Sequence, residues 1–473
     1  MSLTSRLFLF GSAASFGDPP HWIAHTGIGD PPGTNDSEAG YAVSVDSSNK
    51  IYALFDGSGS ANIGVARYDP DGTLNPTNSY VYNTAVTYSF NPKDIHVDEN
   101  AYIYICGHES SNHRAFIAKL TPNFANPYIE WSHNYDPSGT PVTAIYEAVK
   151  TDSSGNVYVC GSRNNYTGAS TNQPAGVIQK FNSVGSQAWQ KFIYDPDTSH
   201  TDNIPTNLAD LAITSDGSII AVGSNGDNSL TPADSGSFLV TKWASDGTLQ
   251  WQKIVGDRAT TGKSQSLHHV ELDSNDNIYC VGANSDVSNA VDVFVMKMNS
   301  SGTVQWQQTV GQGTTHTESR MSVAISPSGN SLYISYHELD NPNNDFHGVV
   351  LKCSASDGSI DWSNRLRPSN SDTRRIEFRD TALDSSENVL LVGMAYWDAT
   401  EPSDILTCKL PPDGSGTGTY GPFTYESYSL TRTITTFPTT TTTLSVTNGA
   451  MAAQAGVSVS QTVTYPNTVY NIP

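Results

Sequence analysis

The residues of this chain that could do chemistry match none of the common catalytic patterns. The 473 residues contain no GxSxG motif, no HExxH motif and no phosphate-binding Walker loop. Twelve histidines are scattered along the chain, and the adjacent pair His268 and His269 would point to opposite faces of a strand, so the two could not share a metal ion. We therefore predict a protein that is not an enzyme and that binds no metal ion and no cofactor.

The carboxylates that recur in the sequence open short turns. The turn segments are DSSNK at 46, DENAY at 98, DSSGN at 152, SDGS at 215, DSNDN at 273, SPSGN at 326 and DSSEN at 384. An Asp or Ser side chain at the start of such a turn accepts backbone hydrogen bonds, and Gly or Asn tolerates the positive φ that follows. We interpret these acidic residues as parts of hairpin turns. A carboxylate pair assembled across repeats for polysaccharide cleavage is the alternative.

A basic residue recurs once in each repeat, always within an apolar, strand-like segment. The seven positions are Arg67, Lys119, Lys180, Lys242, Lys297, Lys352 and Lys409. A cation in such a segment needs a carboxylate partner or a path to water. We favour a structural basic ring that pairs with the turn carboxylates. A basic ring lining a central channel is the alternative.

Aromatic and histidine side chains gather in the longer connections of the chain. They are Tyr166, Tyr194, His337, Phe346, His347, Tyr396 and Trp397. The loops at 162–176, 224–237, 284–292, 337–347 and 395–404 would share one face of the fold. Exposed aromatic rings on a rigid scaffold can stack on sugars or anchor a protein partner, so we predict a partner- or glycan-binding loop face. Ordinary loop packing is the alternative.

An internal repeat of about 56 residues positions these side chains. The repeat is measured by Trp131, Trp189, Trp251, Trp306 and Trp362, which are separated by 58, 62, 55 and 56 residues. Within 269–311 the repeat contains four strand-like segments, HVELD, IYCVG, VFVMKM and TVQWQQTVG, joined by turns. Four short strands with tight turns predict one antiparallel blade of an all-β propeller.

The two ends of the repeat array fix the number of blades. The last repeat lacks its Trp-bearing fourth segment after Asp413, and the missing phrase, PHWIAHTG, occurs at residues 20–27. Trp22 lies 109 residues before Trp131, which is close to two periods. We predict a seven-bladed propeller over residues 20–425, in which residues 20–30 complete the last blade and leave no open sheet edge. Residues 1–19 form an N-terminal arm, and residues 426–473 form a tail.

Several phrases carry a resemblance to a known family. DSSGNVYVCG at 152–161, FLVTKWASDGTLQWQKIVG at 238–256 and FVMKMNSSGTVQWQQTVG at 294–311 resemble the bacterial β-propeller repeat, and the similarity spans about residues 38–415. The ends, MSLTSRLFLFGSAAS and TRTITTFPTTTTTLSVTNGA, resemble termini of virion structural proteins from tailed phages of marine cyanobacteria. The first resemblance implies the fold but not the activity. The second implies a virion component that is made without a signal peptide.

The composition excludes several classes of partner. The formal net charge of −22 disfavours binding to nucleic acid or to an anionic membrane surface, because both require a basic face. No run of 18 apolar residues occurs, so we expect no membrane insertion. The apolar segment at 7–14 is short, and we interpret it as part of a retained arm. The five cysteines form no CxxC pair, so we expect small buried side chains instead of a disulfide framework.

The tail has an unusual composition. After Arg432 no Asp, Glu, Lys or Arg occurs through Pro473, and the segment is rich in Thr, Val and Ser, which favour extended backbone. We predict that the tail docks onto a neighbouring subunit by strand addition. A disordered Thr-rich linker is the alternative.

Three functions are compatible with these observations. We favour a non-enzymatic structural or attachment protein of a phage virion, located in the tail or a tail fibre. Its partners would be other virion subunits, bound through residues 1–19 and 426–473, and a glycan or receptor on the host surface. A secreted bacterial surface or carbohydrate-binding propeller, located outside the cell, is the first alternative. A polysaccharide-active propeller enzyme is the second.

Overall fold

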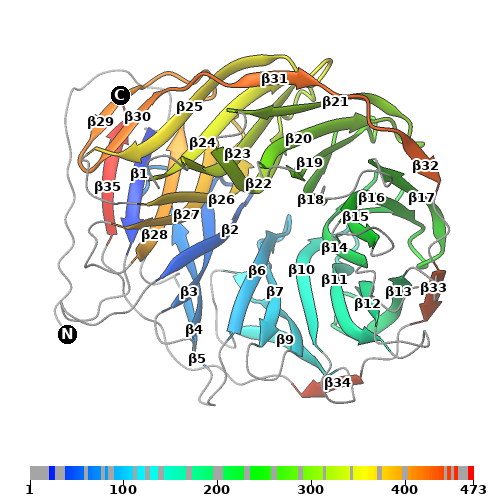
Figure 1. Ribbon diagram of the computed structural model, residues 1–473. Helices are drawn as coiled ribbons and strands as arrows, with labels where there is room; N and C mark the ends of the chain where they lie inside the picture. The colour runs from blue at the N-terminus through cyan, green and yellow to red at the C-terminus, as the bar shows by residue number, and fades with distance from the viewer. Residues whose placement is uncertain are drawn as a thin grey trace.

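The predicted seven-bladed β-propeller is confirmed by the computed structural model, in which seven blades of antiparallel strands are arranged in a ring (Figure 1). The structure describes residues 21–26, 38–57, 62–75, 80–83, 90–109, 114–122, 128–136, 143–166, 173–194, 206–227, 235–256, 264–285, 291–312, 316–340, 345–369, 375–396, 403–441, 445–448, 452–455 and 467–472. All regular elements in this part of the chain are strands.

The first four blades follow the chain in order. Blade 1 contains β2 (Ala39–Val45), β3 (Ile51–Gly57), β4 (Asn62–Tyr68) and β5 (Tyr80–Asn83). Blade 2 contains β6 (Phe90–Val97), β7 (Ile103–Glu109), β8 (Arg114–Leu120) and β9 (Ile129–Asp136). Blade 3 contains β10 (Ala144–Thr151), β11 (Val157–Tyr166), β12 (Gln173–Phe181) and β13 (Gln187–Tyr194). Blade 4 contains β14 (Thr206–Ile213), β15 (Ile219–Asp227), β16 (Ser235–Trp243) and β17 (Leu249–Val255).

The remaining blades continue the same pattern up to the closing strand. Blade 5 contains β18 (Ser264–Leu272), β19 (Ile278–Ser285), β20 (Val291–Met298) and β21 (Val304–Gly311). Blade 6 contains β22 (His316–Ile325), β23 (Ser331–Asp340), β24 (Asp345–Ser354) and β25 (Ile360–Pro368). Blade 7 contains β26 (Ile376–Leu383), β27 (Val389–Tyr396) and β28 (Ser403–Leu410), and its fourth strand is β1 (His21–Thr26) from the start of the chain.

The turn between the first two strands of a blade is held by its opening side chain. In blade 3, Asp152 Oδ1 accepts hydrogen bonds from the N–H groups of Ser154 at 3.0 Å and Asn156 at 2.9 Å. The second oxygen of Asp152 accepts the hydroxyl of Tyr158 at 3.1 Å, which ties the turn to the next strand. This use of Asp explains the recurrence of the turn motif without any catalytic role for it.

The predicted closure of the ring by the N-terminal strand is confirmed. Strand β1 pairs antiparallel with β28, and Trp22 lies opposite Lys409. This register repeats that of the other blades, in which Trp131 lies opposite Lys119 and Trp189 opposite Lys180. The first strand of the chain therefore occupies the position of the fourth strand in blade 7.

The chain after blade 7, which includes the tail and begins before it, runs around the outside of the propeller and adds strands to its blades (Figure 1). Its strands are β29 (Gly418–Tyr420), β30 (Phe423–Ser427), β31 (Thr431–Ile434), β32 (Thr439–Thr441), β33 (Ser445–Asn448), β34 (Ala452–Ala455) and β35 (Asn467–Ile472). From β30 onward they pair antiparallel with the outer strands of blades 6, 5, 4, 3, 2 and 7, in this order. We call strands β30–β35 the belt. The belt strands therefore have partners within their own chain, and docking of the tail onto a neighbouring subunit stays a prediction.

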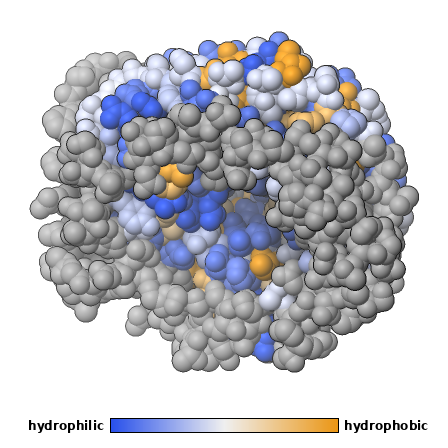
Figure 2. All heavy atoms as spheres, viewed as in Figure 1, coloured by the Kyte–Doolittle hydropathy of each residue, from blue (hydrophilic) through white to orange (hydrophobic). Residues whose placement is uncertain are grey.

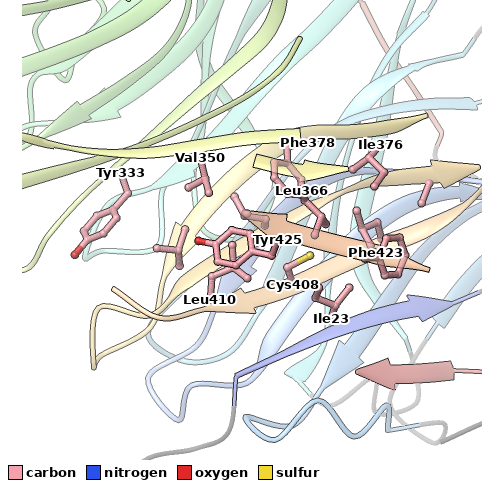
Figure 3. Close-up of a cluster of buried hydrophobic side chains, with 14 residues drawn as sticks. Ile23, Tyr333, Val350, Leu366, Ile376, Phe378, Cys408, Leu410, Phe423 and Tyr425 are labelled. Atoms are coloured by element: carbon pink, nitrogen blue, oxygen red, sulfur yellow. The ribbon is translucent and has the colours of Figure 1, made fainter. Parts of the chain in front are cut away.

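Apolar contacts also fix the belt to the ring. Phe423 and Tyr425 of β30 are buried in the cluster between blades 6 and 7, together with Ile23 of β1 (Figure 3). Farther along, the ring of Phe437 packs against Phe238 and Phe294, with centroid distances of 6.2 and 5.7 Å. The belt is thus part of the hydrophobic core as well as an added row of backbone hydrogen bonds.

Candidate functional site

The seven residues of the basic ring lie in the third strands, at the joints between blades. Four of these side chains lie over tyrosine rings, with nitrogen-to-centroid distances of 3.8 to 5.1 Å; they are Lys119, Lys180, Lys297 and Lys352. Lys409 is fully buried and forms an ion pair of 2.9 Å with Asp384, which opens the turn of its own blade. Arg67 is buried close to Tyr52 and Asp46, and Lys242 is close to Asp216.

Several of these cations also reach the following blade. Lys180 donates to the carbonyl of Ser245 at 3.4 Å, and Lys297 donates to that of Ala355 at 3.2 Å. The Nε1 group of Trp189 donates to the same Ser245 carbonyl at 3.0 Å. The ring residues therefore connect neighbouring blades, and none of the seven is among the described residues that line the channel cavities.

The predicted loop face is more buried than the sequence suggested. Strands β23 and β24 extend through His337, Phe346 and His347, so these residues are in strands and not in a loop. His337 and His347 are only 4% and 6% exposed, and the Phe346 ring is covered by the Arg375 guanidinium at 3.6 Å. Tyr194 is half-buried against a core cluster.

Three other residues of the predicted face complete the set. Tyr396 ends β27, is half-buried and donates its backbone N–H to the carbonyl of Arg375 at 2.9 Å. Tyr166 ends β11 and pairs with Gln173 through the backbone. Trp397 lies outside the described residues. The described side chains of this set, which do not include those of Tyr166 and Trp397, are not gathered into one exposed patch, and binding by the loop face stays a prediction.

The central channel instead collects polar side chains that sequence reasoning missed. The innermost strand of every blade contains a β-bulge, where the pairing register shifts. The residues directly after the shift, which we call the bulge ring, are Ala42, Asp94, Ala148, Asp210, His269, Ser322 and Asp380. A bulge interrupts the alternation of side chains, so His268 and His269 both line the channel, contrary to the prediction of opposite faces.

The polar bulge residues cap backbone groups of the following blade. The N–H groups of Val149, Val270 and Val43 donate to Asp94, Asp210 and Asp380 at 2.9, 2.8 and 2.8 Å, and that of Val323 donates to His269 Nδ1 at 2.9 Å. A bulge leaves backbone N–H groups without a ladder partner, and a buried N–H needs an acceptor. These side chains are therefore first of all structural links between blades.

Four side chains of the bulge ring contact one another in a row, and they include the Asp, His and Ser residue types of a catalytic triad. His269 Nε2 lies 3.2 Å from Asp210, and Ser322 Oγ lies 3.1 Å from His269 Nδ1 and 2.7 Å from Asp380. The Val323 N–H already occupies the Nδ1 lone pair, so His269 has no free lone pair to accept the serine proton. Ser322 instead donates to Asp380 and accepts the N–H of Thr381 at 3.1 Å, which leaves the hydroxyl without an activating base.

The channel is divided by the bulge ring into two cavities. The cavity on the side of the first turns has a volume of about 470 Å³ and is lined by Asp94, His96, Lys150 and Glu271, among others. Lys150 Nζ lies 3.5 Å from Asp94. Burial raises the pKa of Asp94 to about 6, although Lys150 opposes the shift, and burial lowers the pKa of His96 to about 3. Desolvation also raises the pKa of Glu271.

The cavity on the side of the long connections is smaller, with a volume of about 110 Å³. It is lined by polar side chains that include Tyr41, Lys93, Glu147, His268 and Arg379. Figure 2 shows hydrophilic residues lining the central hollow in the view of Figure 1. In the described part of the chain, no group of three or more His, Cys, Asp or Glu side chains is arranged to hold a metal ion. The same residues include no helix that is long and apolar enough to cross a membrane.

A sequence signal for the bulge ring does exist. Asp94, Asp210, His269, Ser322 and Asp380 each stand four residues before the residue that opens the following turn. Such a constant spacing of polar residues inside otherwise apolar strands marks a shared position in every repeat. It does not reveal the bulge, because the bulge depends on pairing with the second strand.

Comparisons with known proteins identify no family for this chain. No family model matches the chain, and no curated protein sequence is similar to it. Among solved structures, the chain is similar to a protein of unknown function from Dyadobacter fermentans (TM-score 0.42, 12% identity, 82% of this chain and 97% of that chain). It is also similar to the polysaccharide lyase Uly1 (TM-score 0.43, 10% identity, 85% and 94%) and to an endo-arabinase from Bacteroides thetaiotaomicron (TM-score 0.30, 8% identity, 56% and 92%). Similarities at this level support no statement about activity.

Proposed function

We propose that the protein is a non-enzymatic structural and attachment component of a bacteriophage virion, located in the tail or a tail fibre. The observation that carries this proposal is the belt, which pairs with the outer strands of six blades. An uncovered outer strand offers its N–H and C=O groups to any other chain. The belt replaces these edges with strands of only three to six residues, which leave short outer edges where subunits of a symmetric assembly would dock.

The chemistry of the interior supports a structural role. The five cysteines are buried as free thiols, so the fold is held by packing and strand pairing and not by disulfides. The polar bulge residues are engaged with backbone N–H groups, and Ser322 has no base to activate it. The polar bulge residues thus have structural tasks that account for their presence.

The virion location rests on the resemblance of the chain ends, and the partners follow from it. Other tail subunits would bind the N-terminal arm, which lies outside the described residues, or the outer edge of the belt strands. A glycan or receptor on the host surface would bind the face of the long connections.

The test is mass spectrometry and immunogold electron microscopy of purified phage particles whose genome encodes this chain. We expect the protein in the particles at a fixed copy number, with gold label on the tail. Particles that lack the chain, while it accumulates in the medium, would refute the virion role.

A secreted or cell-surface carbohydrate-binding propeller is the second candidate. The polar mouth of the channel, with Tyr41, Lys93 and Arg379, is the observation that favours it. Recovery of the chain from the bacterial envelope or medium, together with sugar binding, would support this candidate.

A further inference from the structure

A tryptophan connects the fourth strand of one blade to the third turn of the next blade. Its Nε1 group donates to a carbonyl of that turn at 3.0 to 3.4 Å in the pairs Trp22 and Pro70, Trp131 and Ser183, Trp189 and Ser245, Trp306 and Ala355, and Trp362 and Pro412. The Trp251 ring of blade 4 lies against Gly302 of blade 5. The joint between blades 1 and 2 has no such contact, because the sequence contains no tryptophan between Trp22 and Trp131.

The bulge ring supplies a second kind of link, which the same joint also lacks. The side chains that accept a backbone N–H of the next blade are those of Asp94, Asp210, His269, Ser322 and Asp380. The bulge residue of blade 1 is Ala42, which has no acceptor, and the Ile95 N–H of blade 2 donates to Asp94 of its own blade at 2.8 Å. Blade 3 also has an alanine, Ala148, but its joint with blade 4 keeps the tryptophan link. Among the described residues, the joint between blades 1 and 2 is therefore the one that lacks both links.

Apolar packing is the main contact between blades 1 and 2. The cluster between them contains Leu54 and Val65 of blade 1 and Phe90 of blade 2. A hydrogen bond from the Val97 N–H to Ser44 Oγ at 3.1 Å also crosses this joint. Regions with fewer specific contacts open locally at a lower free energy than the rest of a fold. The loss of both recurrent links therefore makes this joint the place where the ring should open most easily.

Blade 1 is bound to blade 7 by several polar contacts. Trp22 and Lys409 of blade 7 donate to the Pro70 carbonyl of blade 1 at 3.2 and 3.3 Å. Directly before β2, the Glu38 N–H donates to the Ser403 carbonyl of blade 7 at 2.8 Å. In the part of the chain that the structure describes, the outer strand β5 pairs with β4 alone, so no belt strand holds blade 1. A separation of blades 1 and 2 would therefore leave blade 1 attached to blade 7.

We propose that the joint between blades 1 and 2 is a seam at which the closed propeller opens reversibly. In the open form, blade 1 moves with blade 7, and the apolar cluster around Leu54 and Val65 becomes accessible to solvent. The other joints stay closed, because each keeps a tryptophan link, a bulge-ring link or both. This inference concerns a conformational device of the ring, and it does not depend on the proposed virion role.

The test is thiol labelling of the folded full-length protein with N-ethylmaleimide, followed by peptide mass spectrometry. Val65 and Val240 are matched positions, since both are buried in the third strands of blades 1 and 4, at the joints between blades 1 and 2 and between blades 4 and 5. The second of these joints has both links. We expect the thiol introduced by Val65→Cys to be labelled about tenfold or more faster than that introduced by Val240→Cys. The native Cys106 and Cys160, buried at the next two joints, are internal controls and should be labelled slowly.

A second variant restores the missing link. Ser322 performs this task in blade 6, where its Oγ accepts the Thr381 N–H at 3.1 Å, so Ala42→Ser should supply an acceptor at the same position of blade 1. Added to Val65→Cys, it should slow labelling about threefold or more. Ala148→Ser is the matched control in blade 3 and should leave the rate unchanged. Equal rates for the two cysteine variants would overturn the inference. Fast labelling that Ala42→Ser does not slow would overturn it too, because fraying of β5 would then explain the access.

Hydrogen exchange of the wild-type protein keeps the test valid if a variant does not fold. The Ile95 N–H in β6 has no acceptor from the bulge ring of the preceding blade, whereas the Val270 N–H in β18 donates to Asp210 of the preceding blade at 2.8 Å. The peptide that contains β6 should therefore take up deuterium faster than the peptide that contains β18. Uptake by β6 that is no faster than uptake by β18 would overturn the seam.

Discussion

Replacing Lys409 by methionine tests how much the joint between blades 7 and 1 depends on one buried ion pair. Lys409 is fully buried, lies 2.9 Å from Asp384 and donates to the carbonyl of Pro70 in blade 1 at 3.3 Å. Methionine keeps most of the length and apolar volume of lysine. The Lys409→Met variant therefore removes the charge and its hydrogen bonds while leaving most of the packing intact.

The expected loss follows from what remains around Asp384. Removing one partner of a buried ion pair typically costs about 3–5 kcal/mol. Asp384 keeps three hydrogen bonds of 2.9 Å, donated by the N–H groups of Ser386 and Asn388 and by the Asn388 side chain. We therefore expect a loss at the lower end, about 3 kcal/mol of unfolding free energy at neutral pH.

The pH dependence has a defined sign. Burial tends to raise the pKa of Asp384, but the contacts with Asn388 and Lys409 outweigh burial, and the pKa lies below its usual value. A carboxyl group with a lowered folded-state pKa stabilises the protein above its unfolded-state pKa, and this contribution disappears as the pH falls through the folded-state pKa. Lys409→Met removes part of this contribution. The stability difference between wild type and variant should be largest at neutral pH and should shrink below about pH 4.

Urea unfolding followed by tryptophan fluorescence measures this difference. The matched control is Lys297→Met, because Lys297 donates to a carbonyl at 3.2 Å and lies over the Tyr279 ring at 5.0 Å. The control should lose about 1 kcal/mol, with little dependence on pH. A Lys409→Met loss no larger than that of the control at pH 7, or a difference that stays constant down to pH 3, would refute the reasoning.

Two further predictions concern the belt and the joints between blades. Deleting residues 431–473 should leave a folded propeller that self-associates through its uncovered outer strands. Size-exclusion chromatography with light scattering measures the mass of the particle in solution. A deletion variant that stays monomeric contradicts the prediction. Gly185→Ala should destabilise more than Gly217→Ala in urea unfolding, by about 1–2 kcal/mol. Both glycines have positive φ, +84° and +78°, but a Cβ at Gly185 would lie 2.6 Å from the Trp131 ring, whereas a Cβ at Gly217 meets nothing within 4 Å. Equal losses in the two glycine variants would mean that the tryptophan contact is unimportant.

The ring of blades could be predicted from the sequence because the same side-chain contacts recur from blade to blade. In six blades a tryptophan of the fourth strand lies opposite the basic residue of the third strand, as Trp131 and Lys119 show, so a regular spacing of the two types records the blade geometry. Trp22 keeps the same relation to Lys409 across almost the whole chain, which is why the closing strand could be found from a single phrase.

The channel could not be predicted in the same way. Period-two alternation assigns His268 and His269 to opposite faces, and the bulge that brings both to the channel arises from pairing between two strands. Asp210 and His269 come from different blades and lie 3.2 Å apart, and nothing in either local sequence indicates their proximity. Burial also changed the interpretation of His337, because β23 extends farther than the apolar pattern suggested.

The tail shows another limit of prediction from sequence, which is the identity of the pairing partner. Its Thr-rich, uncharged composition correctly indicated extended strands in need of partners, as β31, β32 and β33 show. Composition does not specify which chain supplies the partner. The outer strands of the same propeller are always available at high effective concentration, and this favours pairing within the chain.

The order of the belt has a consequence for how the molecule would respond to mechanical force. Strands β1 and β35 are antiparallel neighbours, with His21 opposite Ile472, so the chain enters and leaves blade 7 at the same end of this pair. Tension applied between the two termini would open the pair one hydrogen bond at a time, as a zipper opens, because the load is concentrated on the outermost bond. The belt would then detach from blade 2, blade 3 and onward, each as a small separate step, while the same force acts on the pairing of β1 with β28. If the force acted between one terminus and one face of the propeller instead, the closed ring would bear the load directly, and the belt would not detach first.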